Sequence, residues 1–405
     1  MPVTPSEELV ASLCQRSFLT LWSEANPRGR SAKELCDVLV VCGDDIVLFS
    51  VKDIALKDTG NITLDWERWR RKAIDDSVKQ LYGAERALST LSRITRSDGT
   101  PGMALPAVAN RRIHRVAVAL GGRGAVPYLH GEFGKGFVHV LDDVALPLVL
   151  GELDTISDFL HYLNTKEALL ANGVATLMEG QEEDLLAFYI HQGRDFPEGH
   201  DMMVIGNDLW DALIKKPEWK ARKDADRQSY LWDGLIETLQ SLNDQDALPP
   251  TDALDTLESA LRAMARETRF CRRMLAQGFD EFMKAAAAVK IRSRIMPSLS
   301  DTRYVFLATP RDANREDRRR ELVLRCFVAR GMMECGDTVV GVATERYEKG
   351  QGFSLDAVRL IKPTWTPRDQ DAMKGIQRDL GYFATPLNSR ATGDEFPLNI
   401  DGDDK

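Results

Sequence analysis

The stretch 33–53, KELCDVLVVCGDDIVLFSVKD, decides the fold that we expect for the first part of this chain. Two apolar, β-branched runs flank the polar break at 43–45, which is the pattern of a buried β-hairpin. Asp37 enters the first run and Lys52 leaves the second. In an antiparallel pair joined by a short turn, the start of one strand lies beside the end of the next. The sequence therefore predicts that Asp37 and Lys52 are neighbours.

The segments around this hairpin predict helices and further strands. Thr4 is placed as the N-cap of a helix that should run to about residue 23, with Glu7 positioned to close a capping box. Apolar spacing predicts a second helix over 66–88. We then expect two strands and a helix, at 115–120, 137–141 and 146–170. This order predicts an α/β sandwich around a mixed sheet that ends near residue 172.

The remainder of the chain divides into a helical region and a second α/β region. The longest expected helix covers 254–290, which contains no proline. Strand patterns return at 304–307 and 338–343, and the acidic tail 399–405 should be disordered. The sequence therefore predicts three parts, 1–172, 173–298 and 299–405.

Charge is distributed unevenly along the chain. The net charge is −9, but residues 1–150 hold 19 Lys and Arg against 18 Asp and Glu, whereas 151–405 hold 34 against 44. Basic side chains also cluster within the first part. A nucleic-acid partner is therefore compatible with the first part only. We expect the acidic helical region to be a partner-binding or regulatory part of the protein, since its negative charge disfavours a nucleic-acid groove.

Several classes of protein are disfavoured. No run approaches the ~20 apolar residues of a membrane helix, and the N-terminus lacks the pattern of a signal peptide, so we expect no membrane partner and a cytoplasmic location. The six cysteines lack CxxC spacing and should be reduced core thiols. No P-loop, Gly-x-Ser-x-Gly motif or paired histidine spacing is present.

The order of elements over roughly residues 4–172 resembles that of the PD-(D/E)XK nuclease superfamily. It consists of a helix, an acid that opens a strand, a returning strand of the hairpin that ends in x-x-Lys, and a second helix. The resemblance implies a restriction-endonuclease-like mixed sheet sandwiched by helices. It also implies hydrolysis of DNA phosphodiester bonds with Mg²⁺ or Mn²⁺, with RNA as the second choice of substrate. Such folds in bacteria often serve in defence against foreign DNA.

The resemblance assigns roles to individual residues. Asp37 matches the acid that binds the metal, and Lys52 matches the lysine that orients or helps to deprotonate the attacking water. The second metal-binding acid should stand at position 50, where this chain has Ser50. A hydroxyl is a weaker, neutral ligand for a hard cation. Another acid would have to compensate: Glu34 is our first choice, and the alternatives are Asp53, Glu7, Glu8 and Glu24.

The helix after the hairpin supplies two further expectations. Gln80 occupies the element on which RecB-like members carry a glutamine that shapes the active site. At the start of this helix, a basic and aromatic cluster suits contact with phosphates and stacking on bases, formed by Arg68, Trp69, Arg71 and Lys72. Trp66 and Trp69 are three residues apart at the start of a helix, and this spacing favours packing in the core or at an interface over base stacking.

Two readings of the hairpin site therefore stay open. In the first, Asp37 and Lys52 belong to a nuclease. In the second, Ser50 indicates that the metal chemistry has been lost, and the fold acts as a nucleic-acid-binding or assembly module. An ordinary ion pair at the end of a sheet is the structural alternative to both.

Overall fold

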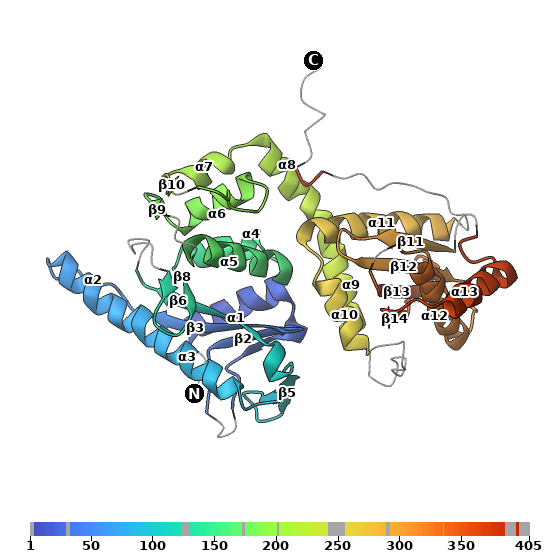
Figure 1. Cartoon of the computed structure of the whole chain (residues 1–405), viewed down its shortest axis with the longest axis horizontal. Helices are drawn as coiled ribbons and strands as arrows, with labels where there is room; N and C mark the ends of the chain where they lie inside the picture. Colours follow the sequence, from blue (N-terminus) through green and yellow to red (C-terminus); the bar gives the residue numbers. More distant parts are fainter. Residues whose placement is uncertain are drawn as a thin grey trace, which may run out of the picture. The chain divides into compact units, whose positions relative to one another are not determined.

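A computed structural model describes the chain over residues 4–29, 33–122, 130–171, 175–200, 202–241, 256–288, 292–334, 336–384 and 394–396. The chain divides into two compact units, residues 1–219 and 220–405 (Figure 1). Each unit is built on its own central sheet.

Unit 1 contains a six-stranded mixed sheet with the strand order β1-β2-β3-β6-β8-β7. The predicted hairpin is confirmed, because β2 and β3 pair antiparallel with Val38 opposite Phe49. The next two neighbours, β6 and β8, run parallel to β3, and the edge strands β1 and β7 are antiparallel to their partners. The strands are β1 (Ser23–Ala25), β2 (Val38–Cys42), β3 (Asp45–Asp53), β6 (Arg112–Leu120), β7 (Gly131–Glu132) and β8 (Phe137–Leu141).

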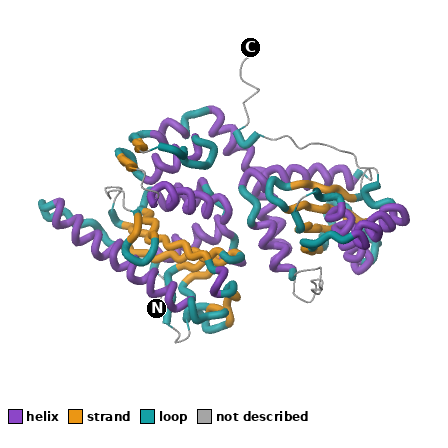
Figure 2. Tube along the Cα trace, viewed as in Figure 1, coloured by secondary structure: helices purple, strands orange, loops and turns teal. Residues whose placement is uncertain are grey.

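Helices cover both faces of this sheet, as Figure 2 shows. On one face, Phe49 of β3 packs on Phe159, with 6.2 Å between the ring centroids. On the other face, Leu48 shares a core with Val78 and Leu81. The first face is covered by α1 (Pro5–Phe18), α4 (Ala145–Glu152) and α5 (Ile156–Ala171), and the second by α3 (Asp76–Leu88). The expected mixed sheet between helices is therefore confirmed.

The N-terminal helix begins as predicted and ends earlier. Thr4 and Glu7 form the capping box, and α1 ends at Phe18. A 3₁₀ turn, Thr20–Trp22, follows and leads into β1. Pairing of β1 with β2 satisfies backbone groups that would otherwise lie unpaired at the sheet edge, so the chain leaves the helix before residue 23.

The helix after the hairpin is one long, continuous segment. It comprises α2 (Ile62–Arg70), a π-helical turn (Arg71–Asp75) and α3. Asn61 caps its start by accepting a hydrogen bond from the Leu64 amide. A π turn adds a residue to the helical repeat, which changes the direction in which the following side chains point.

Smaller elements complete unit 1. A short antiparallel hairpin, β4 (Arg93–Thr95) and β5 (Pro101–Ala104), follows α3. After α5, the parallel pair β9 (Ala175–Met178) and β10 (Met202–Ile205) is connected through α6 (Glu182–His191). The helix α7 (Leu209–Leu213) packs against α6.

Unit 2 contains a four-stranded sheet with the order β11-β12-β13-β14. Its central pair is parallel and its edges are antiparallel. The strands are β11 (Ser293–Pro297), β12 (Thr302–Thr309), β13 (Thr338–Glu345) and β14 (Leu355–Ile361). One face packs on α12 (Arg315–Gly331), against which α13 (Pro367–Leu380) lies. The other face packs on α9 (Tyr230–Gln240), α10 (Leu257–Ala265) and α11 (Arg269–Ala287).

The helical region therefore differs from the expectation of a separate domain at 173–298. Its first elements belong to unit 1. The helix α8 (Pro217–Asp226) follows them in the sequence, and α9 to α11 then pack on the sheet of unit 2. The single long helix expected over 254–290 is two helices. Thr268 caps the second by accepting from the Cys271 amide, and Arg272 donates to the carbonyl oxygens of Ala265 and Glu267, which satisfies the end of the first.

Across the described residues, no helix is both long and apolar enough to cross a membrane. Five cysteines are buried free thiols, as expected for a reduced core: Cys14, Cys36, Cys42, Cys271 and Cys326. The tail 399–405, which we expected to be disordered, lies outside the described residues.

Candidate functional site

The register of the hairpin places the predicted site residues on one face. Val38 pairs with Phe49, and the Asp37 amide donates to the Phe49 carbonyl at 3.1 Å. Side chains alternate between faces along a strand, so Asp37, Ser50 and Lys52 share the face that carries Leu48 and packs on α3. The neighbourhood that the sequence predicted is therefore present in the fold.

Asp37 is buried and is fixed by the backbone of the opposite strand. Its side chain is 3% exposed, and its Oδ2 accepts a hydrogen bond from the Val51 amide at 2.5 Å. The pKa of Asp37 is raised from 3.8 to about 6. Burial is the largest cause, the Val51 amide and the Lys52 charge oppose the rise, and a hydrogen bond with Glu34 and the charge of Glu7 add to it. Asp37 thus changes its protonation state close to neutral pH.

Gln80 joins the helix to the hairpin. Its Oε1 accepts hydrogen bonds from Lys52 Nζ and from Ser50 Oγ, both at 3.0 Å. Ser50 is fully buried, so this contact satisfies its hydroxyl. Gln80 therefore holds the lysine in place, and the ammonium of Lys52 lies within electrostatic range of Asp37.

The candidate acids separate into those near Asp37 and those committed elsewhere. Glu34 shares a hydrogen bond with Asp37, and Glu7 contributes a nearby negative charge. Asp53 accepts from the Ser6 hydroxyl, and Glu24 pairs with Arg96 at 3.5 Å. Glu8 is exposed on α1. Of the proposed substitutes for an acid at position 50, Glu34 has the closest interaction with Asp37.

A cavity opens directly beside this cluster. Its volume is about 510 Å³, and both Glu34 and Gln80 line it. Three basic side chains stand around it: Lys33, Lys79 and Arg86. Each is exposed, and the Lys79 ion pair with Asp76 is exposed on both sides, so it contributes little stability and can give way to another anion. The cavity thus combines a carboxylate edge with a basic rim.

The basic cluster on the preceding part of the helix is only partly available to a ligand. Arg68, Arg71 and Lys72 are exposed. The positive charges of Lys52 and Arg71 both help to lower the pKa of Asp76. Trp69 is 2% exposed, and its indole Nε1 donates to the Ile54 carbonyl at 2.6 Å. Trp69 is therefore a core anchor of α2, and we correct the expectation that it offers an open face for base stacking.

Sequence reasoning missed the residues that build the cavity. Lys79, Gly83 and Arg86 lie at helical spacing along α3, and Lys33 precedes Glu34. An i, i+4, i+7 pattern counted from Lys79 would have found the helical part. The contribution of Lys33 depends on how the chain enters β2, which no local pattern encodes.

The donor set suits a hard divalent cation, although sparsely. Among the described residues, no group of three or more His, Cys, Asp or Glu side chains is placed to hold a metal. Mg²⁺ commonly uses one or two protein carboxylates, with water and substrate phosphate oxygens completing its shell. Asp37 and Glu34 are two such carboxyl groups, held close enough to share a hydrogen bond, and a cation can take the place of the shared proton.

Comparisons of the chain with protein-family models, with curated proteins and with solved structures give no match. The resemblance to PD-(D/E)XK nucleases therefore stays a prediction from the sequence.

Proposed function

We propose that unit 1 is a restriction-endonuclease-like domain that hydrolyses phosphodiester bonds of nucleic acid, with DNA as the first choice of substrate and RNA as the second. The single observation that carries the proposal is that Asp37 interacts with Glu34 and Lys52 donates to Gln80, and both Glu34 and Gln80 line a basic-rimmed cavity. A role in bacterial defence follows only from the resemblance.

The residues of this chain would divide the work of hydrolysis as follows. The cavity rim binds the phosphate backbone through Lys33, Lys79 and Arg86. Lys52, oriented by Gln80, stabilises the negative charge that develops on the phosphoryl oxygens. Asp37, whose pKa of about 6 leaves it largely ionised at neutral pH, supplies a carboxylate that can hold a divalent cation.

A divalent metal ion, Mg²⁺ or Mn²⁺, would be held by Asp37 and Glu34. When bound, it would supply Lewis-acid stabilisation and a more acidic water. The neutral hydroxyl of Ser50 is already used in the contact with Gln80, so we assign it no part in metal binding.

A second candidate function is binding of nucleic acid without cleavage. The observation that favours it is Ser50, which stands fully buried where the resemblance expects a carboxylate. With a neutral hydroxyl instead of a carboxylate at position 50, the affinity for the metal falls, whereas the basic rim of the cavity is unaffected.

Cleavage assays separate the two candidates. The full chain is incubated with plasmid, linear and single-stranded DNA and with RNA, in Mg²⁺, in Mn²⁺ and in EDTA. We expect cutting that requires the metal, and a loss of about 100-fold or more in Asp37→Asn and Lys52→Met. Asp58→Asn and Lys57→Met are matched controls, because both side chains are exposed beyond β3, and they should cut normally.

Each outcome decides between the proposals. Binding without metal-dependent cutting by the parent protein would support the second candidate and overturn the first. Cutting that survives both Asp37→Asn and Lys52→Met would place the activity elsewhere in the chain. Neither binding nor cutting at low salt would overturn both candidates.

A further inference from the structure

A second cavity lies within unit 2 and shares no residue with the nuclease proposal. Its volume is about 390 Å³, and it is bounded by α9, α11 and the loop between β13 and β14. Apolar and aromatic side chains form most of its lining, notably Tyr230, Phe279, Met283, Tyr347, Phe353 and Leu355. A volume of this size is within the range of small-molecule sites.

The rim of this cavity exposes aromatic rings to solvent. Tyr347 and Phe353 are each 61% exposed, and Tyr230 is 49% exposed. Phe279 lies deeper, in edge contact with Phe306 of the sheet at 5.1 Å between ring centroids. A concave site with an aromatic rim and an aromatic floor is suited to a flat, ring-shaped ligand, which can make stacked and edge contacts with both.

One polar atom inside this lining lacks a protein partner. Thr344 lines the cavity and is 2% exposed, and its Oγ1 makes no hydrogen bond. Its neighbours across the sheet, Ala308 and Leu355, are apolar. Valine would fill the same space without leaving a polar atom unsatisfied. The buried hydroxyl of Thr344 therefore has hydrogen-bonding capacity that no protein group uses.

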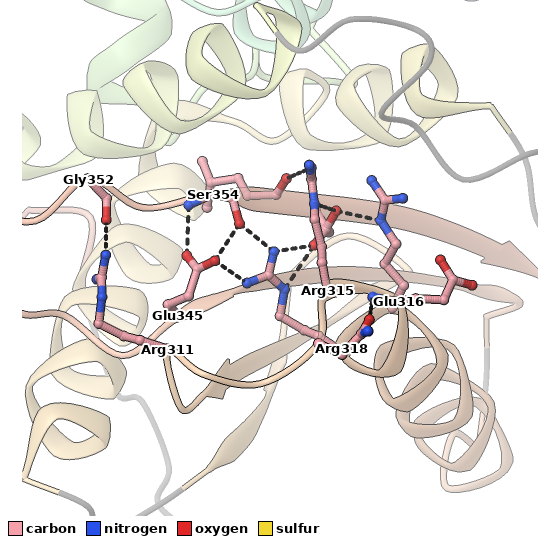
Figure 3. Close-up of polar contacts among 11 residues, drawn as sticks. Arg311, Arg315, Glu316, Arg318, Glu345, Gly352 and Ser354 are labelled. Atoms are coloured by element: carbon pink, nitrogen blue, oxygen red, sulfur yellow. Dashed lines mark hydrogen bonds and ion pairs between the residues drawn. The ribbon is translucent and has the colours of Figure 1, made fainter.

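The charged groups of the cavity already have partners, and Figure 3 shows those of Glu345 and the bond between Arg311 and the Gly352 carbonyl. Glu345 accepts from the amide and hydroxyl of Ser354 and pairs with Arg318 at 2.7 Å. Arg311 donates to the Gly352 carbonyl and lies 3.6 Å from Glu348. A ligand with a full charge would have to displace one of these contacts, whereas a neutral ligand would not.

We propose that the unit-2 cavity binds a neutral aromatic ring compound of about nucleoside size, which hydrogen-bonds to Thr344 and packs on Phe279 and on the rim aromatics. The proposal is independent of the nuclease function. Four observations support it: the volume of the cavity, its aromatic lining, the pairing of its charged side chains, and the unsatisfied hydroxyl of Thr344.

Calorimetric titration of the full chain tests the class of ligand. Adenosine and uridine serve as neutral aromatic probes, ribose controls for the sugar, and decanoate represents an aliphatic anion. We expect saturable binding of at least one nucleoside and none of ribose. Tighter binding of decanoate than of both nucleosides, or no binding of either nucleoside, would overturn the proposal.

Two threonine variants test the site. Thr344→Val should weaken binding of the nucleoside about tenfold, since one buried hydrogen bond is lost. Thr309→Val is the matched control: its hydroxyl is also buried and unsatisfied, but it follows Val305 and Leu307, which face α12 on the other side of the sheet. Equal affinities of the parent and Thr344→Val would contradict the assigned contact.

A rim variant guards against a misfolded Thr344→Val protein. Phe353 is exposed, so Phe353→Ser should leave the thermal transition unchanged while it lowers the affinity for the nucleoside severalfold. Unchanged affinity in Phe353→Ser, in a protein that melts normally, would overturn the placement of the ring at this rim.

Discussion

At the scale of single residues, the candidate site is shaped by burial of a carboxyl group. Asp37 gains one strong backbone hydrogen bond from Val51, but desolvation outweighs it, and the pKa rises to about 6. A buried acid with a raised pKa is a common feature of functional sites, because structural stability alone does not favour it.

The raised pKa of Asp37 predicts a pH-dependent stability. The folded-state pKa, about 6, lies above the ordinary value of 3.8, so the stability that Asp37 contributes is complete below about pH 4 and is lost as pH rises through 6. The loss amounts to about 3 kcal/mol. Denaturant unfolding in EDTA should show Asp37→Asn gaining stability relative to the parent over this range, and a difference that does not vary with pH would contradict the assignment.

Ser50 offers a gain-of-function test at the residue scale. Ser50→Asp places a carboxylate in a fully buried position, so we expect it to lower the stability by roughly 2 kcal/mol without metal. Added Mn²⁺ should raise the melting temperature of Ser50→Asp more than that of the parent. Ser50→Ala is the control, and an equal metal effect in Ser50→Asp and Ser50→Ala would show that position 50 does not face the metal.

At the scale of elements, one long helical segment connects the hairpin to the cavity. It consists of α2, the π turn and α3. Trp69 fixes its first part through Ile54, and Gln80 fixes its second part through Lys52 and Ser50. The π turn at Arg71–Asp75 lies between these two contacts. Its extra residue lets both contacts form, since it changes the angular relation between the helix segments.

Trp69→Phe distinguishes an anchor from a base-stacking residue. The variant keeps an aromatic ring but loses the hydrogen bond to the Ile54 carbonyl, so stability should fall by about 1 kcal/mol. Affinity for single-stranded DNA should change less than twofold, because the ring is buried in the parent. Fluorescence-anisotropy titration and thermal denaturation measure the two effects, and a large loss of affinity with normal stability would contradict the core role.

At the scale of the whole molecule, the two units carry the two proposed sites separately. Every residue of the nuclease proposal lies in unit 1, and the entire lining of the second cavity lies in unit 2. The expectation that the acidic helical region binds a protein partner stays a prediction. Its helices α9 to α11 are structural parts of unit 2, since they cover its sheet.

Truncation before α8 tests this division of labour. A fragment of residues 1–216 ends before Pro217, and α8 uses Asp226 to pair with Arg273 of unit 2 at 3.0 Å. We expect the fragment to show the circular dichroism of a folded α/β domain and to keep the nuclease activity, while nucleoside binding is lost. A folded fragment that no longer cuts DNA would show that unit 2 contributes to the site.

The sequence by itself determined the elements whose cause is local. The hairpin 38–53 followed from two apolar runs around a polar turn, and the start of α1 followed from Thr4 and Glu7. The neighbourhood of Asp37 and Lys52 followed from the same hairpin, since antiparallel pairing with a short turn leaves little choice of register. The boundaries of the helical region could not be predicted from local sequence. The break at Thr268 is stabilised by Arg272, whose contacts form only in the folded chain.

Only the tertiary structure decided which side chains meet at the two proposed sites. Glu34 was the first choice from the sequence, but only the structure separates it from the alternatives: it shares a hydrogen bond with Asp37, whereas Asp53 and Glu24 have other partners. Because Trp69 is buried, it is not part of the candidate nucleic-acid surface. The packing of α9 and α11 beside β13 forms a cavity lined by Thr344, which no sequence motif predicts. Local patterns fix the elements, but contacts between distant elements depend on how their faces pack.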